Sequence, residues 1–498
     1  MTSMQPPGVS LRKRIILLFL CTFLGVLVLS GRLVWIQFVQ GEELRRAAAE
    51  LRMRDILVAP RRGTIYDRNG EELAVSVNVE SIYAIPAEVR AHDPAAVAQK
   101  LAPLLNADAE EIKAKLTKRA SFVWIQRKVD PEVARQIRAL RLPGIRFTQE
   151  SRRFYPNGQL LAQVLGFTGI DNQGLEGIEV AYDDRLRGTP GRLQVEFDAR
   201  GLELPQTRQN LVPPVDGENL YLTIDEVIQY IAERELDRLM LQHRARRALI
   251  IVLDTRTFEI LAMAQRPTYD PNQALDYGPE LWRNSMVSDS FSPGSVFKIV
   301  TAAAAIDSGL MSPGTPFYDP GYIKVPGHTI TNWNGRGLGS TTLAEGIKKS
   351  SNVVLAATGL ALGVERFYTY LEKFGFGART GIDLPGEAVG ILPAKERVRP
   401  IDLAVMAFGQ TLTVTPLQLI TAVATIANDG VMMQPHLALR FTDSEGRVTE
   451  EIKPVARRRV LKVETARALR EMMKKVVEEE GGTGARARVP GYYVAGKT

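Results

Sequence analysis

An uncharged apolar run near the N-terminus most strongly constrains how this chain can fold. Residues 15–31 contain no charged side chain, and Arg12, Lys13 and Arg14 precede them. A run of this length is at the short end of what spans a bilayer as a helix. Basic residues before such a run keep the N-terminus in the cytoplasm. We therefore expect residues 1–40 to form a cytoplasmic tail and a single transmembrane anchor.

A cleaved signal peptide is the alternative interpretation of this run, and we favour the retained anchor. The apolar region is long for a signal peptide, and Leu29-Ser30-Gly31 is a poor Ala-x-Ala cleavage site. In either case the chain from about residue 40 onward lies outside the cytoplasmic membrane. Cys21 is the only cysteine and lies within the run, so it cannot form a disulfide inside the exported part.

Composition narrows the possible partners and cofactors. The 498-residue chain has a net charge of +7 and a pI of about 9.3, with basic and acidic residues interspersed. This pattern suits an anionic membrane surface or polymer, and no nucleic-acid-binding motif accompanies it. One cysteine and four scattered histidines offer no metal-ligand spacing. We expect no nucleic-acid partner, no metal and no cofactor.

Residues 41–215 contain no combination of nucleophile, base and orienting group. We expect them to form an elongated, non-catalytic module of mixed α/β structure with a core of its own. The proline-rich segment 212–217 predicts a linker, so we expect the domain boundary at residue 215. The patterns in this module predict helices over 42–54, 94–105 and 109–116, a strand over 122–128 and a hairpin turn over 67–70.

Residues 216–498 predict an α+β domain, with an antiparallel sheet flanked by helices. Asp225 is a candidate N-cap for a helix that ends near His243. The other predicted elements are a strand over 220–224, a hairpin over 248–254 and 258–264, helical regions over 341–362 and 403–426, and the start of a strand over 491–498.

A candidate nucleophile lies where a turn meets an alanine-rich helix. Pro293 and Gly294 predict the turn, and the run after Lys298 favours a helix. Ser295 then lies at the helix start, with the amine of Lys298 one turn further on the same face. Free N–H groups at a helix start favour developing negative charge. A Ser-x-x-Lys spacing also arises by chance, so it indicates a catalytic serine only when further motif residues follow later in the chain.

Three motifs follow one another along the chain: Ser295-Val296-Phe297-Lys298, Ser350-Ser351-Asn352 and Lys497-Thr498. This order resembles the penicillin-binding proteins and serine β-lactamases, whose motifs are S-x-x-K, S-x-N and K-T-G. The resemblance covers nearly the whole chain from about residue 10, and a class B penicillin-binding protein of the division or sporulation type is the member it is most similar to. Further stretches that carry it are 62–70, 152–156, 166–169, 174–179, 291–294, 375–382 and 409–416.

The resemblance implies a role for each motif residue. Ser295 is the acylated nucleophile, and Lys298 is the base that takes its proton. A neutral lysine at pH 7 needs its pKa lowered by about three units from about 10.4, and burial and the nearby cation of Lys497 act in that direction. Ser350 relays the proton to the leaving amine, and Asn352 orients Lys298 and binds the substrate backbone. Helix capping is the alternative explanation for Ser350 and Asn352 taken alone.

The third motif departs from the family pattern. Lys497 and Thr498 should hold the terminal carboxylate of the substrate, but the family's glycine and the strand after it do not follow Thr498. The resemblance implies that this strand supplies one of two oxyanion-hole N–H groups, and losing such a donor costs about 100- to 1000-fold in rate. We interpret the chain as a truncated version of a longer protein and expect it to be inactive or nearly so.

The reaction implied is D,D-transpeptidation of peptidoglycan stem peptides through a serine acyl-enzyme, which β-lactams trap. The partners implied are a SEDS-family glycosyltransferase and other membrane proteins of the division machinery. An elongation-type transpeptidase is the alternative within the class. A β-lactamase and a non-catalytic scaffold or β-lactam sensor are the alternatives outside it.

Overall fold

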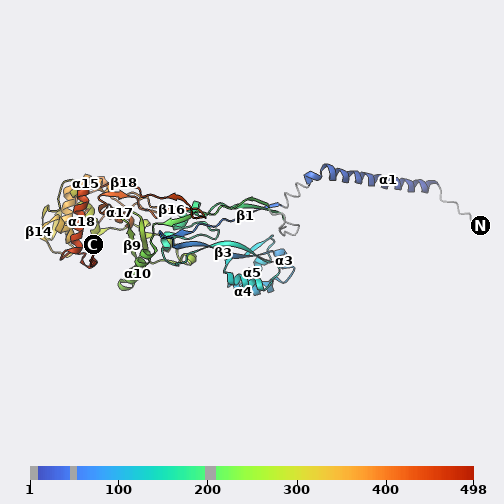
Figure 1. The fold of residues 1–498 in the computed structure, drawn as a ribbon, viewed down its shortest axis with the longest axis horizontal. Coiled ribbons are helices and arrows are strands. Elements are labelled where there is room, and N and C mark those ends of the chain that lie inside the picture. Colours follow the sequence, from blue (N-terminus) through green and yellow to red (C-terminus); the bar gives the residue numbers. More distant parts are fainter. Residues whose placement is uncertain (1–8, 45–52, 197–208) are drawn as a thin grey trace, which may run out of the picture.

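The structure is a computed structural model that describes residues 9–44, 53–196 and 209–498 (Figure 1). Helix α1 (Val9–Val34) lies at one end of an elongated molecule, and α15 and α18 lie at the other end. A π-helical turn, Trp35–Val39, continues α1. The segment Lys13–Val39 is long and apolar enough to cross a membrane, and the rest of the described chain buries none of it. The predicted membrane-length helix is confirmed.

A small lobe of the N-terminal module has its own core. Strand β3 (Glu72–Ala84) pairs antiparallel with β4 (Val123–Val129) and β5 (Ile145–Phe154), and helices cover this sheet. Asp93 and Asp108 cap the first turns of two of these helices. The helices of this lobe are α3 (Pro86–Arg90), α4 (Pro94–Leu105), α5 (Ala109–Leu116) and α6 (Pro131–Ala139).

A seven-stranded sheet runs through the middle of the molecule in the order β17-β16-β8-β2-β3-β4, with β5 also on β3. The hairpin turn after β2 (Ile65–Tyr66) is confirmed, because Asp67 accepts the backbone N–H groups of Asn69 and Glu71. Strand β2 also pairs in parallel with β8 (Asn219–Leu222). The other strands of this sheet are β16 (Ala438–Thr442) and β17 (Val448–Glu451).

This sheet joins the two halves of the chain through one hydrophobic core. The core combines Ile65 and Leu73 with Leu220, Met263 and Phe441, so it crosses residue 215. The expectation of a separate N-terminal core is therefore wrong outside the small lobe. The physical reason is that β2 has only two residues and gains stability by pairing with β8, which follows the proline-rich segment.

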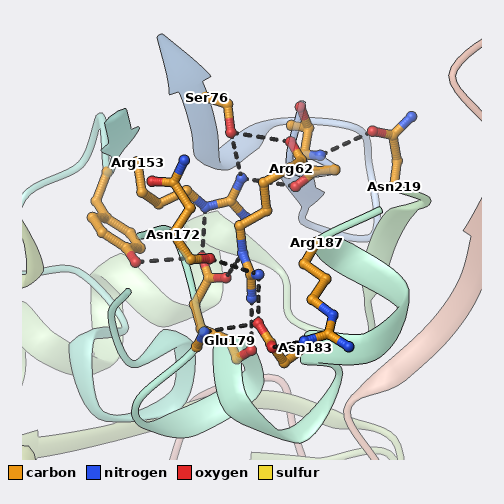
Figure 2. Close-up of polar contacts among 12 residues, drawn as sticks. Arg62, Ser76, Arg153, Asn172, Glu179, Asp183, Arg187 and Asn219 are labelled. Carbon is orange, nitrogen blue, oxygen red and sulfur yellow. Dashed lines mark hydrogen bonds and ion pairs between the residues drawn. The ribbon is translucent and has the colours of Figure 1, made fainter. Parts of the chain in front are cut away.

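A buried network of charges lies on the N-terminal side of this junction (Figure 2). The Glu179 carboxylate accepts Nε of Arg62 at 2.6 Å and Nε of Arg153 at 2.6 Å, and all three side chains are almost fully buried. Arg62 also donates to Asp183 at 2.6 Å. Glu179 therefore balances two buried guanidinium groups that come from distant parts of the sequence. Around the junction lie α7 (Ala162–Leu165), α8 (Gly177–Ala181) and α9 (Asp183–Leu186).

A separate three-stranded sheet lies on the membrane side of this junction (Figure 1). Strand β6 (Gly191–Glu196) pairs antiparallel with β1 (Met53–Val58) on one side and β7 (Gln209–Val212) on the other. The predicted helix over 42–54 is wrong at its end, because residues 53 and 54 belong to β1, and residues 45–52 lie outside the described part. Pairing with β6 outweighs the local helical pattern there.

The C-terminal half contains the largest core, built around α13 (Lys298–Asp307), α15 (Asn352–Lys373) and α18 (Val463–Glu478). The predicted cap at Asp225 and the hairpin of β9 (Ala248–Leu253) and β10 (Ile260–Arg266) are confirmed. Its other helices are α10 (Glu226–His243), α11 (Pro279–Trp282), α12 (Ser285–Ser288), α14 (Leu343–Lys348), α16 (Pro400–Met406) and α17 (Pro416–Ala427). Its other strands are β11 (Pro316–Asp319), β12 (Tyr322–Val325), β13 (His328–Thr331), β14 (Gly339–Thr342), β15 (Val431–Met433) and β18 (Ala456–Arg459). Short 3₁₀ turns cover Pro271–Asp276, Gly294–Phe297, Lys395–Arg397 and Ala485–Ala487.

Three predicted elements of this half differ in detail. The helical region over 341–362 divides at Ser350 into α14 and α15, and the region over 403–426 divides into α16 and α17. Residues 491–498 form no strand, and the prediction of one is wrong for the described chain. Their one backbone hydrogen bond to a distant element runs from Gly496 to Met473 in α18, and a strand needs a ladder of such bonds to a neighbouring strand.

Candidate active site

Ser295 lies in a short 3₁₀ turn, Gly294–Phe297, directly before α13. Gly294 has a positive φ of 56°, and its N–H donates to the carbonyl of Gly409 at 3.0 Å. A Cβ atom on Gly409 would lie 2.1 Å from the Gly294 carbonyl oxygen, so only glycine permits this approach. The Ser295 side chain is partly exposed. No hydrogen bond of its hydroxyl occurs within the described part of the chain.

A second segment fixes the turn from the other side. Phe291 and Val414 form an antiparallel bridge, and the hydroxyl of Thr301 in α13 donates to the carbonyl of Ala407 at 2.7 Å. The bridging segment then enters α17, where Thr415 provides a capping box. The sequence around Ser295 is thus positioned by two glycines, one bridge and one buried hydroxyl.

Lys298 is fully buried, and its amine points at the second motif. Nζ donates to the backbone carbonyl of Ser350 at 2.7 Å, to Ser350 Oγ at 3.1 Å and to Asn352 Oδ1 at 2.8 Å. Burial, followed by the positive charge of Lys497, lowers the pKa of Lys298 from 10.5 to about 7. Close to neutral pH this amine therefore exists in both charged and neutral forms. The neutral form has a lone pair that can accept a proton.

The loop of the second motif is strained and tightly held. Ser350 has a positive φ of 59°, which is uncommon for a residue with a side chain and costs energy unless its surroundings enforce it. Ser351 caps α15 through its hydroxyl, which accepts the N–H of Val354 at 3.1 Å. Asn352 begins the helix, and its amide nitrogen donates to the carbonyl of Thr331 at 3.0 Å. Its carbonyl oxygen thereby faces Lys298.

Two buried residues that sequence reasoning missed hold this loop in place. Asn332 Oδ1 accepts the backbone N–H of Asn352 at 2.8 Å and the hydroxyl of Ser351 at 3.1 Å. Asp319, which is fully buried, accepts the same hydroxyl at 2.8 Å and the Asn332 amide at 2.9 Å. In the sequence both residues lie in polar turns, where turn chemistry alone explains them. Only the fold reveals that they face the motif.

Lys497 joins the same cluster from the C-terminal segment. Its Nζ donates to Ser350 Oγ at 3.0 Å, so one hydroxyl contacts both lysines. Burial lowers the pKa of Lys497 from 10.5 to about 8. Thr498 instead donates its hydroxyl to Thr483 at 2.9 Å. The structure thus connects Lys298, Ser350, Asn352 and Lys497 by hydrogen bonds, with Ser295 one helical turn from Lys298.

Comparison with known proteins shows which family has this arrangement. Residues 248–498 match the family described as "Penicillin binding protein transpeptidase domain", and residues 57–222 match "Penicillin-binding Protein dimerisation domain". Stage V sporulation protein D of Bacillus subtilis is 37% identical, covering 99% of this chain and 77% of its own. Peptidoglycan D,D-transpeptidase FtsI of Escherichia coli is 33% identical, covering 97% of this chain and 80% of its own.

Solved structures agree with the sequence matches. Penicillin binding protein 3 from Mycobacterium tuberculosis has a TM-score of 0.67 at 30% identity, over 89% of this chain and 81% of that one. Penicillin Binding Protein 2X from Streptococcus thermophilus has a TM-score of 0.69 at 28% identity, over 86% of this chain and 67% of that one. The chain therefore belongs to the class B penicillin-binding proteins, transpeptidases that carry an N-terminal dimerisation domain.

Proposed function

We propose that this chain, a peptidoglycan D,D-transpeptidase of the septal and sporulation type, transfers the acyl group of a stem peptide through Ser295. Ser295 Oγ attacks the carbonyl carbon of the D-Ala-D-Ala bond, the C–N bond breaks, and D-alanine leaves. An amine of a neighbouring stem peptide then attacks the ester, which forms the cross-link and frees Ser295. β-Lactams take the place of the dipeptide and leave a stable acyl-enzyme.

The state of Lys298 is the observation that carries this proposal. A fully buried amine with a pKa near 7 can take the Ser295 proton at neutral pH, which an ordinary lysine cannot do. The three donors of Lys298 are directed at Ser350 and Asn352 in the free protein. Catalytic hydrogen bonds often form fully only when substrate is bound, so the Ser295–Lys298 contact completes in the complex.

The remaining site residues have complementary roles. Ser350 Oγ contacts both lysine amines, which supports a role as the proton relay between Lys298 and the leaving amine. Asn352 orients Lys298 through its carbonyl oxygen, and its amide is available to the substrate backbone. Lys497 and Thr498 bind the terminal carboxylate of the donor peptide, for which a cation and a hydroxyl are suitable partners.

The anchor determines where this chemistry takes place. Lys13 and Arg14 at the start of the apolar helix support a single-pass orientation with a cytoplasmic N-terminus. The transpeptidase then works outside the membrane, next to a SEDS-family glycosyltransferase and other membrane proteins of the division machinery. Protease protection on spheroplasts tests this topology, because residues beyond 53 should be digested from outside.

A donor and acceptor assay tests the reaction. Incubation of the chain extended past Thr498 with a stem pentapeptide and an acceptor amine should release D-alanine and form the amide in equal amounts, and a labelled penicillin should stay bound. Rapid release of the hydrolysed label would favour a β-lactamase. Failure to label at all would favour a scaffold. A fluorescent fusion should gather at the septum, whereas a uniform lateral signal would favour the elongation role.

A further inference from the structure

A basic cavity lies outside the cluster around Ser295, between α17 and the paired strands β15 and β18. Its volume is about 110 Å³, well above the ~10–15 Å³ that a cavity needs to hold one water molecule. Arg379, Arg457 and Arg458 line it, and no aspartate or glutamate does. None of these three guanidinium groups forms an ion pair within residues 209–498 as the structure describes them. The cavity wall therefore carries three positive charges without a carboxylate.

A β-bulge brings two of these arginines to the same cavity. In the β15–β18 pair, Met432 lies opposite Arg458 and Met433 lies opposite Ala456, so Arg457 is the extra residue. Neighbouring residues of a regular strand point to opposite faces, and a bulge changes that direction. Gly381 lies against one of these arginines, since a Cβ atom there would lie 2.6 Å from an Arg457 nitrogen. The backbone is shaped to admit this guanidinium.

A buried hydroxyl in the cavity wall also has no partner. Thr421 in α17 is 3% exposed, and its Oγ1 makes no hydrogen bond in the described chain. Thr425, one turn further on, donates its hydroxyl to the carbonyl of Thr421 at 2.8 Å in the usual way. A buried hydroxyl without a partner is costly, and a ligand oxygen in the cavity would satisfy it.

We propose that this cavity binds a phosphate group. One guanidinium group can donate two parallel hydrogen bonds to two phosphate oxygens, and it remains charged at any physiological pH. A hydroxyl adds a further hydrogen-bond donor. The volume suits one such group. Strand β18 lies at the end of the molecule opposite α1, so the phosphate belongs to a soluble molecule or polymer and not to the lipid headgroups around the anchor (Figure 1).

Calorimetry on the full chain in detergent, at constant ionic strength, tests the site. The probes are inorganic phosphate, a glycerol-phosphate oligomer, and phosphatidylglycerol vesicles. We expect both soluble probes to bind, and R457Q to weaken binding about tenfold or more through the loss of charge-assisted hydrogen bonds. T421V should weaken binding several-fold. Because the Arg457 side chain makes no hydrogen bond or ion pair in the part of the chain that the structure describes, R457Q should leave the melting temperature without phosphate unchanged.

Two matched variants serve as controls. R246Q removes another exposed arginine that has no partner in the described chain, and T425V removes the neighbouring hydroxyl of the same helix. Both should bind phosphate as the unchanged protein does. Equal weakening of phosphate binding by R457Q and R246Q would mean that the change in net charge alone explains the effect, and it would overturn the proposal. Binding to the vesicles alone, or no binding of the soluble probes at millimolar concentration, would also overturn it.

Discussion

At the scale of single residues, the proposed mechanism depends on the electrostatics of Lys298. The motif spacing predicted this residue as the base, and the expected lowering of its pKa agrees with its burial and its repulsion by Lys497. The supporting residues could not be predicted in the same way. Asp319 and Asn332 lie far from the motif in sequence, and their importance arises only when β11 and the turn after β13 are folded against α15.

The pH dependence of acylation follows from the two lysines. The rate should rise as the pH rises through about 7, because only neutral Lys298 accepts a proton. It should fall above about 8 as Lys497 loses the charge that holds the carboxylate. Lys497→Met should remove the falling limb. It should also move the rising limb to higher pH, because the loss of a repelling cation raises the pKa of Lys298. Stopped-flow acylation at β-lactam concentrations well below saturation measures both limbs, because the second-order rate constant reports the pKa values of the free protein. An unchanged rising limb would contradict this electrostatic coupling.

At the scale of elements, the position of Ser295 depends on a contact between two turns. The sequence predicted a helix start at Ser295, but local patterns carry no information about which distant turn supports it. In the structure Gly294 and Gly409 touch backbone to backbone, and the segment after Gly409 pairs with Phe291. For the same reason, the division of the helical region at Ser350 was missed, because a strained φ at that residue is enforced by tertiary contacts.

Gly409→Ala should separate the nucleophile from its base. The new Cβ would overlap the Gly294 carbonyl, and shifting this turn by about 1 Å should slow acylation by about 100-fold. Gly446→Ala is the matched control, because Gly446 has a similar φ, 83° against 85°, and open space around it. It should lose about 1 kcal/mol of stability through backbone strain alone and acylate normally. Comparable acylation rates in the two variants would refute the role of this contact.

At the scale of the whole molecule, the N-terminal module and the transpeptidase part share one core. The family resemblance predicted two consecutive modules, and the prediction of a boundary at residue 215 remains open. Hydrophobic patterns could not predict that β2 and β8 would pair across it, because a two-residue strand leaves almost no periodic signal. The buried Glu179 network lies on the N-terminal side of this junction. Arg153 donates to the carbonyl of Gly63, and the N–H of the next residue, Thr64, donates to Asn219, so the network is connected to both halves.

Glu179→Gln should therefore destabilise both halves together. It leaves Arg62 and Arg153 buried without the carboxylate that they share, which typically costs about 3–5 kcal/mol. Glu110→Gln is the control, because its pair with Lys113 is exposed and worth under about 1 kcal/mol. Calorimetric melting should show one transition shifted down for Glu179→Gln and none shifted for the control. A shift confined to a separate N-terminal transition would contradict the shared core.

The central claim is that Ser295 carries the acyl group, and mass spectrometry of the penicillin adduct tests it most directly. The chain, and a version extended past Thr498 by the segment that completes the third motif, would be incubated with penicillin and digested. We predict a single adduct on the peptide that contains Ser295, formed faster in the extended version and absent from Ser295→Ala, which should keep its melting temperature. An adduct on any other residue, or one that persists in Ser295→Ala, would contradict the account.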